Sequence, residues 1–203
     1  MPFEPWEKYP SLTKDRLTII GSIVRRVRSD TADLHDSGGG DNSWSLGCRA
    51  YARTCFSLRQ AVRDYSWLTI INEEQHLKFT FAIDSIPIRF YHGDASDPPS
   101  KYLERTFGEL RQQEMFSSVG VPVDDVLRLA IETDGKGRAS TITLVEVGKD
   151  NRPTDNMYVV PAEDRKKVIR IQPKGIDLPA PIIEPILTEE QKKQRRKKER
   201  DAG

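Results

Sequence analysis

The sequence has little of what marks the common functional classes. It contains only two cysteines, Cys48 and Cys55, and three scattered histidines, so it offers no zinc-ligand spacing. No apolar run approaches the roughly 18 residues that span a bilayer. The first residues lack the basic start and apolar stretch of a secretory signal. These absences predict a cytoplasmic protein with reduced cysteines and no membrane partner.

Signatures of catalysis and of cofactor binding are also missing. There is no Gly-x-Ser-x-Gly elbow, and the three glycines at 38–40 lack the Lys-Ser/Thr that a phosphate-binding loop requires. We therefore expect no cofactor. Of the 203 residues, 36% are hydrophobic and 31% are charged, the latter above the usual ~25%. This composition excludes collagen-like, coiled-coil and fully disordered chains, and indicates a globular core with polar segments.

Charge is distributed unevenly along the chain. The whole sequence has a net charge of +1, but residues 192–203 hold seven basic and two acidic side chains, a net +5, which leaves −4 for residues 1–191. Such a basic run favours nucleic acid or an acidic protein as partner, because both are polyanions. It has no aromatic residue on which bases could stack. Its basic residues are Lys192, Lys193, Arg195, Arg196, Lys197, Lys198 and Arg200.

Hydrophobic periodicity predicts an α+β fold, with a mainly antiparallel sheet packed against about three helices. The expected helices cover residues 13–29, 43–64 and 101–116. The expected strands cover residues 67–71, 77–83, 86–90, 126–133 and 139–147, with shorter ones at 157–160 and 168–171. Pro87 cannot donate a ladder hydrogen bond, so it favours an edge strand or the start of a strand.

The predicted organisation is one domain followed by two C-terminal segments. The domain covers residues 11–172, and the first ten residues are expected to be extended. Residues 173–187 alternate proline with isoleucine and leucine, which predicts an extended arm. Residues 188–203 form a basic tail with no apolar face, so we expect it to be disordered until it binds a partner.

The helix expected at residues 43–64 carries the most distinctive pattern. Ser43 is its expected N-cap, and its apolar stripe consists of Trp44, Cys48, Tyr51, Cys55, Leu58 and Val62. Next to this stripe, four arginines fall within an arc of about 120°. A basic face of this kind either contacts phosphates or pairs with carboxylates of the protein itself. The four are Arg49, Arg53, Arg59 and Arg63.

Carboxylates of the hairpin expected at 126–147 give the only hypothesis for an enzyme. Glu132, Asp134, Glu146 and Lys149 are loosely similar to the PD-(D/E)xK nuclease pattern, and the resemblance implies a metal-dependent nuclease that uses Mg²⁺ or Mn²⁺. The sequence departs from that pattern because Val147, not an acidic residue, stands two positions before Lys149. A second cluster, His92, Asp94 and Asp97 with Arg89, has the composition of a weak acid–base or metal site.

We interpret the sequence as a non-catalytic binding module for nucleic acid or an acidic protein, acting through the arginine helix face and the basic tail. The nuclease is one alternative. Another is one component of a bacterial two-protein toxin–antitoxin or phage-defence complex, with the C-terminal arm folding onto the partner. The sequence leaves the oligomeric state open.

Overall fold

The computed structural model describes residues 2–72, 78–107, 109–111, 125–162 and 189–201. The chain divides into two units, Met1–Asp164 and Arg165–Gly203. The first unit contains a six-stranded sheet, and the described part of the second is a helix. The strand expected at 168–171 and the extended arm expected at 173–187 lie outside the described residues.

The sheet has the strands in chain order. Each neighbouring pair is antiparallel except β3 and β4, which are parallel. The chain therefore folds as the mainly antiparallel α+β protein that its periodicity predicts. The strands are β1 (Leu68–Asn72), β2 (Thr80–Ile83), β3 (Ile86–His92), β4 (Val126–Thr133), β5 (Ala139–Val147) and β6 (Pro153–Val159).

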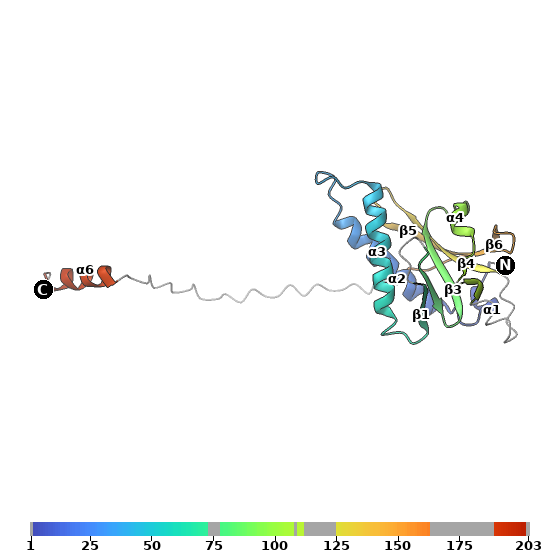
Figure 1. Cartoon of the computed structure of the whole chain (residues 1–203), viewed down its shortest axis with the longest axis horizontal. Helices are drawn as coiled ribbons and strands as arrows, with labels where there is room; N and C mark the ends of the chain where they lie inside the picture. Colours follow the sequence, from blue (N-terminus) through green and yellow to red (C-terminus); the bar gives the residue numbers. More distant parts are fainter. Residues whose placement is uncertain (1, 73–77, 108, 112–124, 163–188, 202–203) are drawn as a thin grey trace. The chain divides into compact units, whose positions relative to one another are not determined.

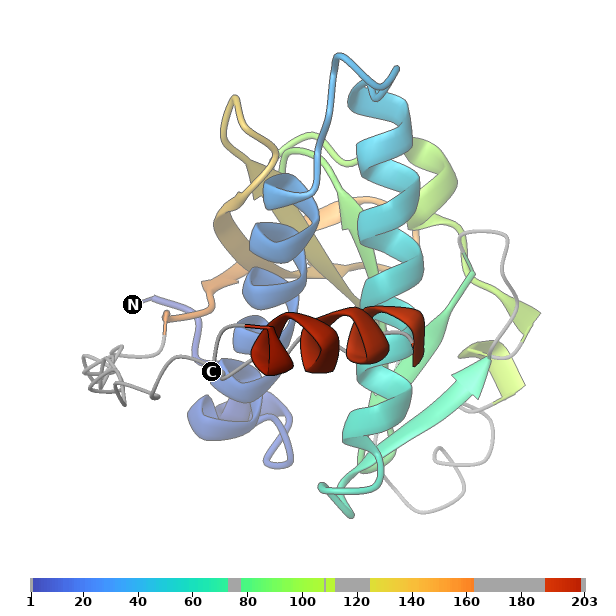
Figure 2. The same cartoon turned by 90° about the vertical axis from the view of Figure 1, so that its left-hand side faces the viewer.

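Two long helices, α2 (Lys14–Asp33) and α3 (Ser43–Ala61), lie side by side on one face of the sheet (Figures 1 and 2). Thr13 caps α2 by accepting a hydrogen bond from the backbone N–H of Arg16. Leu17, Ile20 and Val24 recur at helical spacing and are buried. Amphipathic periodicity thus fixes which side of α2 faces the sheet.

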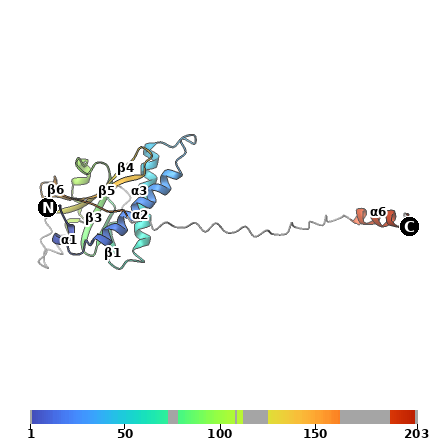
Figure 3. The same ribbon diagram turned by 180° about the vertical axis from the view of Figure 1, so that it is seen from behind.

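Alternating residues of the central strands form the core beneath these helices. Phe81 of β2, Ile88 and Phe90 of β3, and Leu127 and Leu129 of β4 belong to one buried cluster with the apolar faces of α2 and α3. Because successive side chains of a strand point to opposite faces, the intervening residues lie on the second face of the sheet. Figure 3 gives the view of the same layers from behind.

The second face of the sheet is buried as well. Tyr91, Ala130 and Val145 pack there with Tyr102, which belongs to the short helix α4 (Ser100–Leu103). The parallel β3–β4 pair needs a crossover connection, and residues 93–125 make it. Thr80 and Ala82 of β2, which alternate with Phe81 and Ile83, are buried as well.

The helix expected at residues 101–116 is interrupted. Helix α4 ends at Leu103, residues 107 and 109–111 are helical, and residues 112–116 are not described. Arg128 on β4 donates to the carbonyl of Tyr102 at 2.5 Å and to that of Glu104 at 3.3 Å. These carbonyls are bound by a side chain of the sheet instead of by the next turn of a helix, which accounts for the break.

The N-terminal residues, which are expected to be extended, contain the single-turn helix α1 (Pro5–Lys8). Tyr9 and Leu12 follow it and are buried in the main core. Pro87 is the second residue of β3, so it marks the start of a strand and not an edge of the sheet. The residues expected as strands at 126–133 and 139–147 are those of β4 and β5.

The described part of the second unit is helix α6 (Glu189–Arg200). The sequence predicts a disordered tail here, whereas the structure gives a helix. Glu, Gln, Lys and Arg all have high helix propensity. Glutamates 189 and 190 also lie at the N-terminal end and cations at the C-terminal end, as the helix dipole favours. Among the described residues, no helix has the length and apolarity needed to cross a bilayer.

Candidate nucleic-acid interface

Helix α3 begins with a capping box formed by Asn42 and Ser45, so the N-cap expected at Ser43 is wrong. The side chain of Asn42, not Ser43, accepts hydrogen bonds from the backbone N–H groups of Trp44 and Ser45, both at 3.0 Å. The Ser45 hydroxyl in turn accepts from the backbone N–H of Asn42 at 3.0 Å. This reciprocal pair fixes the start of the helix, and Ser43 is its first helical residue.

Only the C-terminal part of the predicted apolar stripe of α3 is in the core. Cys55 and Leu58 are buried, whereas Trp44 is 76% exposed and Cys48 is also exposed. The first turns of α3 make a different contact: the side chain of Leu46 lies against Gly137 in the β4–β5 turn. Trp44 and Cys48 are exposed because the first turns of α3 extend past the edge of the core, which only the later turns of the helix cover.

Two of the four arginines predicted as a binding face have partners within the protein. The Arg49 guanidinium donates to Asp41 at 2.5 Å and to the carbonyl of Leu34 at 3.4 Å, so it holds the loop between α2 and α3. The backbone N–H of Asp36 and the Arg49 guanidinium keep the pKa of Asp41 below its ordinary value. Arg49 therefore supports the loop as well as adding positive charge to the helix.

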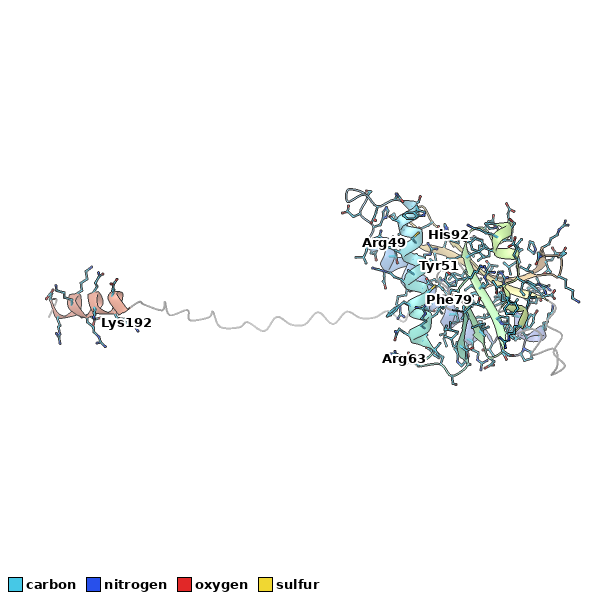
Figure 4. All side chains as sticks on the ribbon, viewed as in Figure 1. Arg49, Tyr51, Arg63, Phe79, His92 and Lys192 are labelled. Atoms are coloured by element: carbon cyan, nitrogen blue, oxygen red, sulfur yellow. The ribbon has the colours of Figure 1, made fainter. Side chains whose placement is uncertain are left out.

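Arg59 also contacts the body of the protein. Its guanidinium lies 5.7 Å from the ring centroid of Phe79, a cation–π contact. Phe79 is buried, and its backbone N–H donates to the Tyr51 hydroxyl at 3.3 Å. Figure 4 shows Arg49 and Arg63 toward the two ends of α3, with Tyr51 and Phe79 between them. Arg49 and Arg59 thus help to hold α3 against the rest of the protein.

Arg53 and Arg63 differ from these two. Both are exposed, and neither side chain forms a hydrogen bond or ion pair with any residue in the described ranges. Arg53 lies near the middle of α3, and Arg63 lies in the turn that continues it. The helix contains no Asp or Glu; the nearest acidic residues in sequence are Asp41, which pairs with Arg49, and Asp64. Arg53 and Arg63 therefore present positive charge to solvent.

Phe56 is a residue of this face that the sequence analysis leaves out. Its side chain is 59% exposed. It lies three residues after Arg53, and seven residues separate it from both Arg49 and Arg63, so helical spacing places all four on one side. The signal was present in the sequence as a phenylalanine outside the apolar stripe and within the arginine arc. We call Arg49, Arg53, Phe56, Arg59 and Arg63 the arginine face.

Helix α6 carries the other predicted contact residues. Lys192 (Figure 4), Lys193, Arg196, Lys197 and Lys198 are exposed. Arg195 belongs to the same helix. The twelve residues of α6 contain seven basic and three acidic side chains and no apolar one. The charge is spread around the helix, so α6 offers electrostatic attraction without an apolar contact surface.

The four residues of the nuclease hypothesis are not brought together. Glu132 pairs with Thr141, and Glu146 pairs with Leu127, five residues away along β4. That offset corresponds to about 17 Å along a strand. Because it is an odd number of residues, Glu132 and Glu146 lie on opposite faces of the sheet. Asp134 lies in the turn beside Glu132, while Lys149 follows the other end of β5.

Each of the three carboxylates has a structural role. Asp134 accepts hydrogen bonds from the backbone N–H groups of Lys136 and Arg138, both at 2.9 Å, and so stabilises the β4–β5 turn. Glu132 accepts from the backbone N–H of Ala95 at 3.3 Å. These contacts hold a turn and a loop, as expected of carboxylates at strand ends.

Glu146 is buried and anchors the N-terminal segment. It accepts hydrogen bonds from Lys8 at 2.6 Å, from the Tyr9 hydroxyl at 2.7 Å and from Asn156 at 2.6 Å. Burial acts to raise the pKa of Glu146, but these hydrogen bonds outweigh it and hold the pKa below its ordinary value. Burial and the same carboxylate raise the pKa of Tyr9. Glu146 is thus an ionised structural group.

The cluster expected around His92 is also dispersed. His92 lies 2.9 Å from the Thr133 hydroxyl on the helix face of the sheet, whereas Arg89 projects to the opposite face and lies 3.6 Å from Glu109. Burial and the positive charge of Arg28 lower the pKa of His92. Within the described ranges, no group of three or more His, Cys, Asp or Glu residues is arranged to hold a metal ion.

Comparison of the chain with protein-family models, with curated proteins and with solved structures finds no match.

Proposed function

We propose that the protein binds nucleic acid without cleaving it, through contacts of the arginine face and α6 with phosphates. The observation that carries this proposal is the state of Arg53, on a helix with no acidic residue, and of Arg63, in the turn that continues it: both are exposed, and neither side chain has a partner among the described residues. Each phosphate neutralised by such a side chain releases condensed counterions, so each adds salt-sensitive affinity.

The composition of α6 favours nucleic acid over an acidic protein. A helix that binds a protein groove uses apolar anchors at positions i, i+3 or i+4 and i+7. Residues 189–200 contain no apolar side chain, so α6 has no such anchor. A phosphate backbone requires none, because its contacts are hydrogen bonds and Coulombic attraction. The expected binding is therefore tolerant of base sequence.

The hairpin carboxylates favour binding over catalysis. A metal-dependent nuclease gathers carboxylates around one or two cations. In this protein Glu132, Asp134 and Glu146 instead accept hydrogen bonds at separate places of the sheet. We therefore expect the protein to bind nucleic acid without cleaving its phosphodiester bonds.

Fluorescence anisotropy with a labelled 20-nucleotide strand and a 20-base-pair duplex, each at 50 and 200 mM salt, tests the proposal. Deletion of residues 188–203 should weaken binding at 50 mM salt at least about tenfold, because it removes seven cations against four acidic residues, a net charge of +3. The double variant Arg53→Gln/Arg63→Gln should weaken binding and reduce the slope of log K against log salt by about 1.5.

Arg152→Gln provides the matched control. Arg152 lies in the β5–β6 turn with its side chain 82% exposed, and its substitution removes one positive charge, as each Arg→Gln change of the double variant does, but away from α3. We expect its affinity and salt slope to equal those of the wild type. Equal affinities for the wild type, the deletion and the double variant would contradict the proposal, as would binding to neither nucleic acid at 50 mM salt.

A further inference from the structure

We infer that the arginine face binds a single strand of nucleic acid, and that one base stacks on the ring of Phe56. This inference rests on the proposed function and names the form of nucleic acid that α3 binds. A charged helix alone would attract single strands and duplexes alike. An exposed aromatic ring among the charges favours single strands over duplexes, because only an unpaired base is free to stack on it.

The surroundings of Phe56, and not its exposure alone, carry the inference. Single exposed hydrophobic side chains are ordinary on protein surfaces. Trp44 is an example on the same helix: it is 76% exposed, but it lies five residues before Arg49 and so projects away from the arginine arc. Phe56 is 59% exposed and lies within that arc, between Arg53 and Arg63.

The spacing along α3 suits a strand that runs along the helix. At 1.5 Å of rise per residue, Arg53 is about 4.5 Å from Phe56 along the axis, and Arg63 is about 10.5 Å away on the other side. A base on the ring therefore has a cation on each side of it, where the flanking phosphates of the same strand pass. Proteins that bind single strands combine these two elements, a basic track and aromatic rings on which bases stack.

A duplex cannot use the ring in this way. Its bases are already stacked on one another, so placing one on Phe56 requires that the base be unpaired and unstacked first. The ring would add nothing to the binding of a duplex, while Arg53 and α6 would still attract its phosphates. Stacking also tolerates any base, because every base has a π-face.

The test uses the full chain with labelled oligo(dT) of 20 nucleotides, a 20-base-pair duplex and an oligoglutamate peptide. Phe56→Leu keeps an apolar side chain and removes the ring, and it should weaken oligo(dT) binding roughly 5- to 100-fold. Its duplex affinity should change less than about twofold. Phe56→Trp should bind oligo(dT) at least as tightly as the wild type, which shows that an aromatic ring is what the position requires.

Trp44→Leu is the matched control, since it removes another exposed aromatic ring from the same helix. It should leave both affinities unchanged. Circular dichroism and the melting temperature establish that each variant is folded.

The outcomes separate this inference from the proposed function. If the protein binds both nucleic acids and Phe56→Leu weakens neither or weakens both equally, stacking on Phe56 is overturned while nucleic-acid binding stands. If the wild type binds neither nucleic acid at 50 mM salt, both proposals fail. Binding of oligoglutamate that depends on Phe56, without binding of oligo(dT), would assign the face to an acidic protein and overturn the inference.

Discussion

Glu109 and Arg128 form an ion pair at 2.6 Å on the second face of the sheet, with both side chains almost completely excluded from solvent. Burial lowers the pKa of Arg128, while the negative charge of Glu109 acts against that change. Arg128 also binds the carbonyls of Tyr102 and Glu104, and Arg89 of the next strand lies 3.6 Å from Glu109. This network attaches the β3–β4 crossover to the sheet.

Glu109→Gln should lower the free energy of unfolding by about 3–5 kcal/mol, because it leaves the charge of Arg128 buried without its partner. Urea denaturation followed by circular dichroism measures the change. The double variant Arg128→Met/Glu109→Leu removes both charges and should cost less than Glu109→Gln alone. A loss under about 1 kcal/mol for Glu109→Gln would show that the pair is not essential to the attachment of the crossover.

Glu146→Gln should destabilise the protein at neutral pH and make its stability depend less on pH in the acid range. The pKa of Glu146 in the folded protein lies below its ordinary value of 4.5, so its stabilising effect is complete above that pH and is lost as the pH falls through the folded value. We expect a loss of about 1–3 kcal/mol at pH 7. The difference from the wild type should shrink below about pH 4.

Thermal unfolding between pH 3 and pH 7 measures this dependence. Glu132→Gln serves as control, because Glu132 is half-buried and, among the described residues, accepts a single hydrogen bond, from the backbone N–H of Ala95 at 3.3 Å. It should change stability much less. If the melting temperature of Glu146→Gln changed with pH in parallel with that of the wild type, the ionisation of Glu146 would not contribute to the pH dependence of stability.

The sequence predicts the elements of this fold better than the contacts between them. Strands β4 and β5 have the predicted bounds, because alternating residues and a glycine-containing turn are local signals. The pairing of Arg128 with Glu109 has no such signal, since it joins residues 19 positions apart through a parallel crossover. For the same reason the partners of Glu146, 137 and 138 residues away, could not be read from the sequence.

Part of the candidate site could also be predicted. Helical spacing places the four arginines on one side of α3, but spacing does not show which arginines contact the body of the protein. Arg49 meets Asp41 only because the loop folds back, and Arg59 meets Phe79 only because β2 packs beneath α3. Periodicity likewise assigns Trp44 to the core, since it carries no information about how far the core extends along α3.

Asn42→Ala should destabilise the protein by about 1 kcal/mol, whereas Ser43→Ala should have little effect. Asn42 accepts the hydrogen bonds that satisfy the first turn of α3, and Ser43 is the first residue of the helix itself. Chemical denaturation of the two variants side by side measures the difference. If Ser43→Ala proved the more costly change, Ser43 would be the N-cap, as its sequence suggests.

Gly137→Ala should lower the free energy of unfolding by about 1–3 kcal/mol. Gly137 has a φ of +80°, which L residues rarely adopt, and an added Cβ would collide with the side chain of Leu46. Gly135→Ala in the same turn is the control, because nothing lies within 4 Å of its Cβ position. Urea denaturation should find the control within about 0.5 kcal/mol of the wild type. Equal effects at the two glycines would contradict this account of the turn.

Arg49→Gln and Arg53→Gln should separate the structural and binding parts of the arginine face. Arg49 holds the α2–α3 loop through Asp41, so its loss should lower the melting temperature and loosen the loop. Arg53 has no partner among the described residues, so Arg53→Gln should leave the melting temperature unchanged and weaken binding of a 20-nucleotide strand. Its salt slope should fall by about 0.7, the value for one contact with a single-stranded phosphate. Thermal unfolding and anisotropy titrations across a range of salt concentrations supply the two readouts. If Arg53→Gln changed stability without changing affinity, Arg53 would belong to the packing of α3, and the positive charge would have no role in binding.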